Sequence, residues 1–192
     1  MGAAAMDATV LILPLLVVLA VIVVGGRRRG AGWLVVLTRS VLACWLAAVL
    51  ALVMYPFPLP PYEPSIQPPG WTILDWISPP FATIDAALQY GVTAQEALQL
   101  VGNVLLFVPL GFLAPALTPR FRTVARSASL GLLVSLAIEL AQLATTLALH
   151  PFRSADLDDV MLNTIGTVIG FAAWRVASML LVELRRREAP AV

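Results

Sequence analysis

Five long apolar stretches, separated by short polar or proline-rich segments, dominate the pattern along this chain. A helix needs about 20 mostly apolar residues to cross the hydrocarbon core of a membrane. Five stretches approach or reach that length, at roughly residues 8–24, 33–54, 97–117, 127–149 and 160–182. The pattern therefore predicts five transmembrane helices.

The positive charges indicate how these helices are oriented. All 12 basic residues are arginines, and nine of them form three clusters, each just beyond an apolar stretch. The clusters are 27–29, then Arg120, Arg122 and Arg126, then 185–187. Short loops rich in arginine stay in the cytoplasm. We therefore expect the N-terminus outside and the C-terminus in the cytoplasm.

The longest polar segment, about 55–91, lies outside the membrane in this topology. Its first part is rich in proline, which is incompatible with a regular helix. After Pro79 and Pro80, apolar residues recur at helical spacing, which predicts a short interfacial helix on the outer membrane surface. Thr93 and Glu96 have the spacing of a capping box that opens the third span.

Composition supports a membrane protein. The chain is 60% hydrophobic and only 12% charged, with a mean hydropathy of +0.91, whereas soluble domains carry about 25% charged residues. The predicted fold class is an all-α polytopic membrane helix bundle. We divide it into two N-terminal transmembrane helices (1–54), a proline-rich extracytoplasmic segment with the interfacial helix (55–94), a three-helix core (95–183) and a basic cytoplasmic tail (184–192). The net charge of +1 gives no argument for nucleic-acid binding.

Glu139 is the most informative single residue, because a carboxylate inside a span normally has a partner or a task. Ser135, Glu139, Gln142 and Thr146 follow helical spacing and share one face of the fourth span. A polar stripe of this kind must face other helices or a wet cavity.

Further polar residues approach the outer half of the bundle from the neighbouring spans. The predicted ligand-binding residues are Asn103, Glu139, Gln142, Arg153, Asp158, Asp159 and Asn163. Simpler interpretations stay open: Asp158 or Asp159 caps the fifth helix, the asparagines join helices by hydrogen bonds, or Glu139 has a purely structural partner.

Four residues are predicted to shape the contacts between helices. Gly166 and Gly170 form a Gly-x-x-x-Gly pair that allows close approach of another helix. On the third span, Gly111 adds a small residue, and Pro109 should bend or break the helix by removing one backbone hydrogen bond.

Three ordered motifs together resemble the VanZ-like membrane protein family. They are the run from Asn103 through Pro109 to Gly111, the Ser135-x-x-x-Glu139-x-x-Gln142 stripe, and the run from Arg153 through Asp158, Asp159 and Asn163 to Gly170. The resemblance covers about residues 95–175. The family's eponymous member is associated with resistance to teicoplanin, a glycopeptide that acts on cell-wall precursors outside the membrane. The resemblance therefore implies a bacterial cytoplasmic membrane protein with a link to antibiotic resistance.

Three classes of function fit these observations. We expect a non-enzymatic protein that binds a cell-envelope amphiphile, such as a membrane lipid or a lipid-linked wall precursor, at an outward-facing polar site. A structural or assembly subunit, with other integral membrane subunits as partners, is the alternative. A proton-coupled lipid transporter or a membrane enzyme is the third. No catalytic set, metal site or cofactor-binding loop is predicted.

Overall fold

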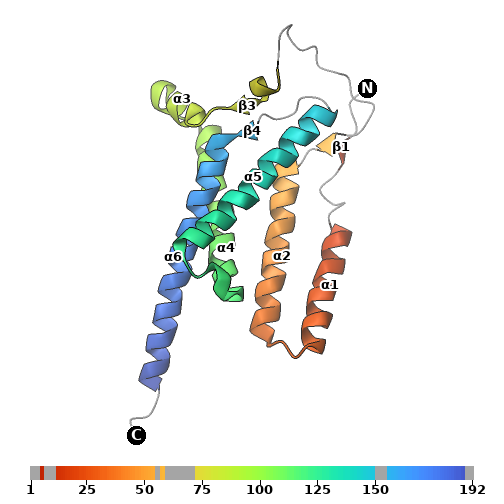
Figure 1. The fold of residues 1–192 in the computed structure, drawn as a ribbon, viewed down its shortest axis with the longest axis vertical. Coiled ribbons are helices and arrows are strands. Elements are labelled where there is room, and N and C mark those ends of the chain that lie inside the picture. Colours follow the sequence, from red (N-terminus) through yellow and green to blue (C-terminus); the bar gives the residue numbers. More distant parts are fainter. Residues whose placement is uncertain (1–4, 7–11, 55–56, 59–71, 150–154, 189–192) are drawn as a thin grey trace.

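Long helices make up most of the chain (Figure 1). The computed structural model describes residues 5–6, 12–54, 57–58, 72–149 and 155–188. Its α-helices are α1 (Ile12–Arg28), α2 (Trp33–Met54), α3 (Ala82–Tyr90), α4 (Ala94–Leu117), α5 (Val124–Leu149) and α6 (Leu157–Glu188). The remaining elements are β1 (Ala5–Met6), β2 (Phe57–Pro58), β3 (Ile77–Ser78), β4 (Ala155–Asp156) and the short 3-10 helices η2 (Ile73–Trp76) and η3 (Pro119–Phe121).

Four of the described helices are long and apolar enough to cross a membrane. They lie within α2, α4, α5 and α6 and correspond to four of the five predicted spans. The predicted helical class is confirmed. The fifth predicted span, 8–24, overlaps α1, which has 17 residues. Residues 8–11 of that predicted span lie outside the described part of the chain. The count of five spans and the orientation of the N-terminus stay predictions.

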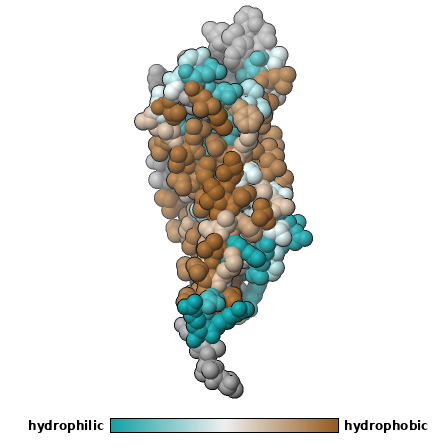
Figure 2. All heavy atoms as spheres, turned by 90° about the vertical axis from the view of Figure 1, so that its left-hand side faces the viewer, coloured by the Kyte–Doolittle hydropathy of each residue, from teal (hydrophilic) through white to brown (hydrophobic). Residues whose placement is uncertain are grey.

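The surface of the bundle has the layering of a membrane protein. Figure 2 shows a broad hydrophobic band along one face, with hydrophilic residues gathered above and below it. Many large apolar side chains on α1, α2 and α6 are exposed, as expected when lipid rather than water surrounds them. The polar side chains of the predicted α5 stripe, in contrast, are buried. This confirms that the stripe faces other helices.

The helix ends differ from the prediction in ways that local chemistry explains. The predicted capping box at the start of α4 is confirmed, with the amide of Glu96 donating to the Thr93 hydroxyl. Pro109 does not break α4, which continues to Leu117, because a spanning helix tolerates one missing backbone bond when its neighbours satisfy the freed group. At the other end of the sequence, α6 continues through the arginines to Glu188, so part of the predicted tail is helical.

The closest packing in the bundle joins α4 to α6. A methyl group at Gly166 would collide with the backbone carbonyl of Val104, and one at Gly170 with that of Val108. From the opposite side, a methyl group at Gly111 would collide with the Thr167 carbonyl. All three glycines lie where the two backbones touch. The close contact therefore depends on the absence of side chains on both helices.

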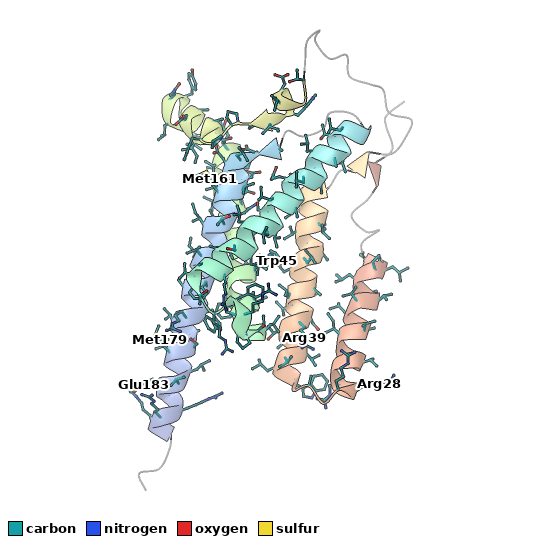
Figure 3. The ribbon with its side chains drawn as sticks, in the orientation of Figure 1. Arg28, Arg39, Trp45, Met161, Met179 and Glu183 are labelled. Atoms are coloured by element: carbon teal, nitrogen blue, oxygen red, sulfur yellow. The ribbon has the colours of Figure 1, made fainter. Side chains whose placement is uncertain are left out.

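Helix α2 packs beside this pair and closes its apolar core. The Trp45 indole Nε1 donates to the Leu106 carbonyl of α4 at 2.5 Å (Figure 3), and its ring meets Phe107 edge-on with centroids 5.8 Å apart. Val49 and Phe107 are fully buried there. The carbonyl that Trp45 binds is next to that of Leu105. The Leu105 carbonyl has no helical donor, because Pro109 lacks a backbone N–H.

Short strands join the segment before α3 to the start of α6. β3 and β4 pair in parallel, with Ile77 opposite Ala155 and Ser78 opposite Asp156. A second pair, β1 with β2, is antiparallel. The helix predicted after Pro79 and Pro80 is present as α3, and it lies at the end of the molecule where α6 begins (Figure 1).

We expect substitution of Gly170 by alanine to weaken the bundle. The added methyl must push α4 and α6 apart, and overpacking of this kind typically destabilises a protein by about 1–3 kcal/mol. Gly102→Ala is the matched control on α4, because its methyl meets nothing within 4 Å. Thermal unfolding in detergent should show a lower midpoint for Gly170→Ala and an equal or higher one for Gly102→Ala. Equal midpoints for both variants would contradict the packing argument.

Candidate functional site

The acidic residues around the start of α6 each have a different partner. Asp156 precedes the helix and caps it, because its Oδ1 accepts from the amide of Asp158 at 2.9 Å. Its other oxygen accepts from the Thr83 hydroxyl at 3.1 Å. The alternative in which Asp158 or Asp159 caps this helix does not hold, since Asp156 has the geometry of the N-cap.

Asp158 instead caps α3. Its carboxylate accepts hydrogen bonds from the backbone amides of Phe81, of Thr83 at 2.9 Å and of Ile84 at 3.3 Å. The side chain is 0% exposed. Phe81 has a φ of 69°, a left-handed conformation that a bulky residue rarely adopts. The three bonds to Asp158 hold this unusual turn and fasten α3 to the bundle.

Two further carboxylates face the inside of the bundle. Asp159 accepts a hydrogen bond from the Asn103 amide of α4, so this pair joins α4 to α6. Glu139 of α5 is 6% exposed, and its Oε2 accepts from the backbone amide of Asp156 at 2.9 Å. Glu139 therefore lies beside the N-terminus of α6, where the helix dipole favours negative charge.

Asn163 connects α6 to the polar stripe of α5. Its Nδ2 donates to the Ser135 hydroxyl at 2.8 Å, and its backbone carbonyl accepts from the Thr167 hydroxyl at 3.0 Å. Its Oδ1 is buried and receives no hydrogen bond within the described part of the chain. A buried acceptor without a donor destabilises a protein by about 1–3 kcal/mol, so this oxygen favours a donor from outside the described residues.

These helices enclose a cleft of about 410 Å³ between α4, α5 and α6. Its lining residues are Leu98, Gln99, Gly102, Asn103, Leu106, Phe107, Ile138, Glu139, Gln142, Asp159 and Asn163. Five of the seven predicted ligand-binding residues are in this list. Asp158 is not, since it faces α3. Arg153 lies outside the residues that the structure describes.

The cleft has a polar part and an apolar part. Two carboxylates and four side-chain amides contribute the polar groups, while Leu98, Leu106, Phe107 and Ile138 provide an apolar wall. No arginine lines it among the described residues. The cleft can therefore accept several hydrogen bonds and donate several, and its negative groups favour a ligand rich in hydroxyl or amino donors.

Two residues of this region were not predicted from the sequence. Gln99 lines the cleft one turn before Asn103, and its i−4 spacing on the same helix face was an available signal. Thr83 contacts two aspartates more than 70 residues away in the sequence, and no local pattern announces that contact. Within the described residues no group of three or more acidic, histidine or cysteine side chains is arranged to hold a metal.

Comparison with known proteins identifies the family. The VanZ/LLP1 family model matches residues 42–180, which is most of the chain. The chain belongs to the VanZ/LLP1 family. The match confirms the resemblance and extends it beyond 95–175, since it includes the part of α2 that carries Trp45. No curated protein and no solved structure matches the chain.

Membership of the VanZ/LLP1 family and the four long apolar helices together indicate a multi-pass membrane protein. The family match contains every residue that lines the cleft and ends at residue 180, before the last arginine cluster. The cleft is therefore part of the region that defines a VanZ/LLP1 protein.

Replacement of Asp158 by alanine should release α3 from the bundle. Three backbone amides would lose their common acceptor, and Phe81 would lose the contact that holds its left-handed conformation. We expect amide hydrogen exchange in residues 81–90 to become roughly tenfold faster, because a lost buried acceptor costs about 1–3 kcal/mol. Asp85→Ala removes the same charge from an exposed position on α3 and should leave that exchange nearly unchanged. Equal exchange in both variants would show that Asp158 does not anchor α3.

Proposed function

We propose that this VanZ/LLP1 protein binds the headgroup of a cell-envelope amphiphile in the cleft between α4, α5 and α6, without chemical conversion of the ligand. The amphiphile would be a lipid, or a lipid-linked cell-wall precursor, of the outer leaflet of a bacterial cytoplasmic membrane. The carrying observation is that Asn103, Glu139, Gln142, Asp159 and Asn163 meet in one cleft although they come from three helices.

The lining favours an amphiphile over a fully polar ligand. One wall consists of apolar side chains, among which Leu98 is 73% exposed. The same cleft also holds the carboxylates and amides. A molecule with a polar headgroup and a lipid chain could satisfy both surfaces, whereas a water-soluble ligand would leave the apolar wall uncovered.

The charge of the lining supports a donor-rich headgroup. Glu139 and Asp159 offer carboxylate oxygens, and the Asn163 Oδ1 has no donor among the described residues. Sugar hydroxyls or an amino group would supply a donor to the Asn163 Oδ1 and add hydrogen bonds to the carboxylates. Contact of Arg153 with an anionic part of the ligand stays a prediction, since that residue is outside the described part.

A structural or assembly subunit is the alternative function. The Gly166 and Gly170 face would suit such a subunit if it received a helix of a partner protein. Within the described chain this face is already covered by α4 of the same molecule. The polar cleft, in contrast, is not filled by the side chains that line it. The geometry therefore supports ligand binding over assembly through this glycine face.

Native mass spectrometry of protein extracted gently from its own membrane tests the proposal. We expect an amphiphile bound at a one-to-one ratio, and we expect the Glu139→Gln variant to lose most of it. Glutamine keeps the shape of the side chain but replaces one acceptor oxygen with a donor and removes the negative charge.

Glu96→Gln is the matched control, because it makes the same change on an exposed position outside the cleft. Glutamine also preserves the capping box at that position. Ligand retained in Glu139→Gln, or lost equally in both variants, would contradict the proposed site. Protein subunits at fixed stoichiometry with no bound amphiphile would favour the assembly function instead.

A further inference from the structure

At the end of the molecule opposite α3, helix α6 extends well past its neighbours. It continues to Glu188, beyond the level at which η3 connects α4 to α5 (Figure 1). Met179 and Glu183 lie on this extension (Figure 3). Its apolar side chains are more than half exposed, namely Val176, Met179, Leu180, Leu181, Val182 and Leu184.

A groove of about 660 Å³ lies where this extension meets the α4–α5 connection. It is lined by Ala116, Arg122, Trp174, Arg175, Ser178, Met179, Val182, Glu183 and Arg186. The residues from Arg175 to Arg186 follow the helical pattern i, i+3, i+4, i+7, i+8 and i+11, so they form one continuous face of α6. The groove therefore follows the helix for about three turns.

The groove carries an excess of positive charge. Arg122, Arg175 and Arg186 line it, and its only lining carboxylate is Glu183. Glu183 is paired with the Nε of Arg187 at 3.0 Å. This pairing compensates the charge of Glu183, so the three lining arginines lack a matching anion among the lining residues.

Arg122 is held in place where the groove meets the α4–α5 connection. Its Nε donates to the Pro115 carbonyl at 3.2 Å, and its guanidinium lies 5.7 Å from the centre of the Trp174 ring. A guanidinium fixed through Nε and an aromatic face keeps its terminal amino groups for a further acceptor. Phosphate oxygens match that planar pair of donors.

The geometry points to a binding site for an anionic phospholipid in this groove, separate from the cleft between α4, α5 and α6. The three arginines would bind the phosphate group, and the acyl chains would lie along Met179 and Val182. The apolar side chains of Met179 and Val182 favour a lipid over inorganic phosphate, because only the lipid covers them. This inference is independent of the ligand proposed for the cleft.

Competitive lipid retention tests this site. The purified full-length chain, stripped of lipid in detergent, is mixed with equal amounts of dioleoylphosphatidylglycerol and dioleoylphosphatidylcholine and examined by native mass spectrometry. We expect retention of phosphatidylglycerol to dominate. In the Arg175→Gln, Arg186→Gln double variant this retention should fall by roughly 25-fold, since each basic residue near an anionic lipid surface contributes roughly fivefold.

The matched control is the Arg28→Gln, Arg185→Gln double variant. It removes the same net charge from two arginines that do not line the groove, and its phosphatidylglycerol retention should stay near that of the unmodified chain. Glu139→Gln should also retain the lipid, which separates this result from a failure of the cleft proposal. A thermal midpoint measured for each variant checks that the bundle is intact.

Three outcomes would overturn the inference. Equal losses in the two double variants would show that overall charge, rather than this groove, attracts the lipid. Equal retention of both lipids by the unmodified chain would remove the basis for an anionic ligand. Complete displacement of phosphatidylglycerol by an equal concentration of inorganic phosphate would show that the apolar side chains of the groove contribute nothing to lipid binding.

Discussion

The contact between the backbones of α4 and α6 is the constraint on which the rest of the structure depends. Helices in a bilayer gain little from hydrophobic association, because lipid chains are as apolar as the side chains they would replace. Close van der Waals contact must therefore hold them together, and Gly111, Gly166 and Gly170 permit it. The same approach brings Asn103 of α4 within hydrogen-bonding distance of Asp159 on α6.

The cleft follows from how the third helix of the core joins this pair. α5 packs against α6 more extensively than against α4. Helices α4 and α5 therefore diverge and leave a polar space between them. A carboxylate within a span costs roughly 2.5–3.5 kcal/mol on insertion scales. For Glu139, part of that cost is offset at the N-terminus of α6, where its carboxylate accepts a hydrogen bond from the Asp156 amide. Its position is thus explained by structure, while the cleft beside it is available for function.

The sequence predicted the helices well because each follows from a physical requirement that acts locally. An apolar stretch of spanning length, a polar stripe with helical spacing and a capping box such as Thr93 with Glu96 are all visible within a few turns. The same periodicity placed Glu139 and Gln142 on one buried face. Convergence of these residues with Asn103 and Asp159 was inferred from their common depth in the membrane, and the cleft brings them together.

The individual roles of the aspartates could not be predicted in the same way. Asp156, Asp158 and Asp159 lie within four residues, and any of them had the chemistry of a helix cap or a ligand. The roles of Asp156 and Asp158 depend on α3, which approaches from a segment more than 70 residues earlier. Trp45 is a similar case, since its partner on α4 is 61 residues away. Contacts of this length leave no periodic signal in a single sequence.

The two ends of α6 show how one helix can serve two chemically opposite surroundings. Its first turn gathers carboxylates that are fixed by hydrogen bonds to α3 and α4, and that acidic end borders the cleft. Its last turns carry arginines along a groove with an apolar wall. The helix dipole favours this arrangement, because it stabilises negative charge at the start of a helix and positive charge at its end. The direction of α6 therefore separates the cleft proposed for a donor-rich headgroup from the groove proposed for an anionic lipid, and a bilayer that surrounds the apolar middle would present each of them to a different leaflet.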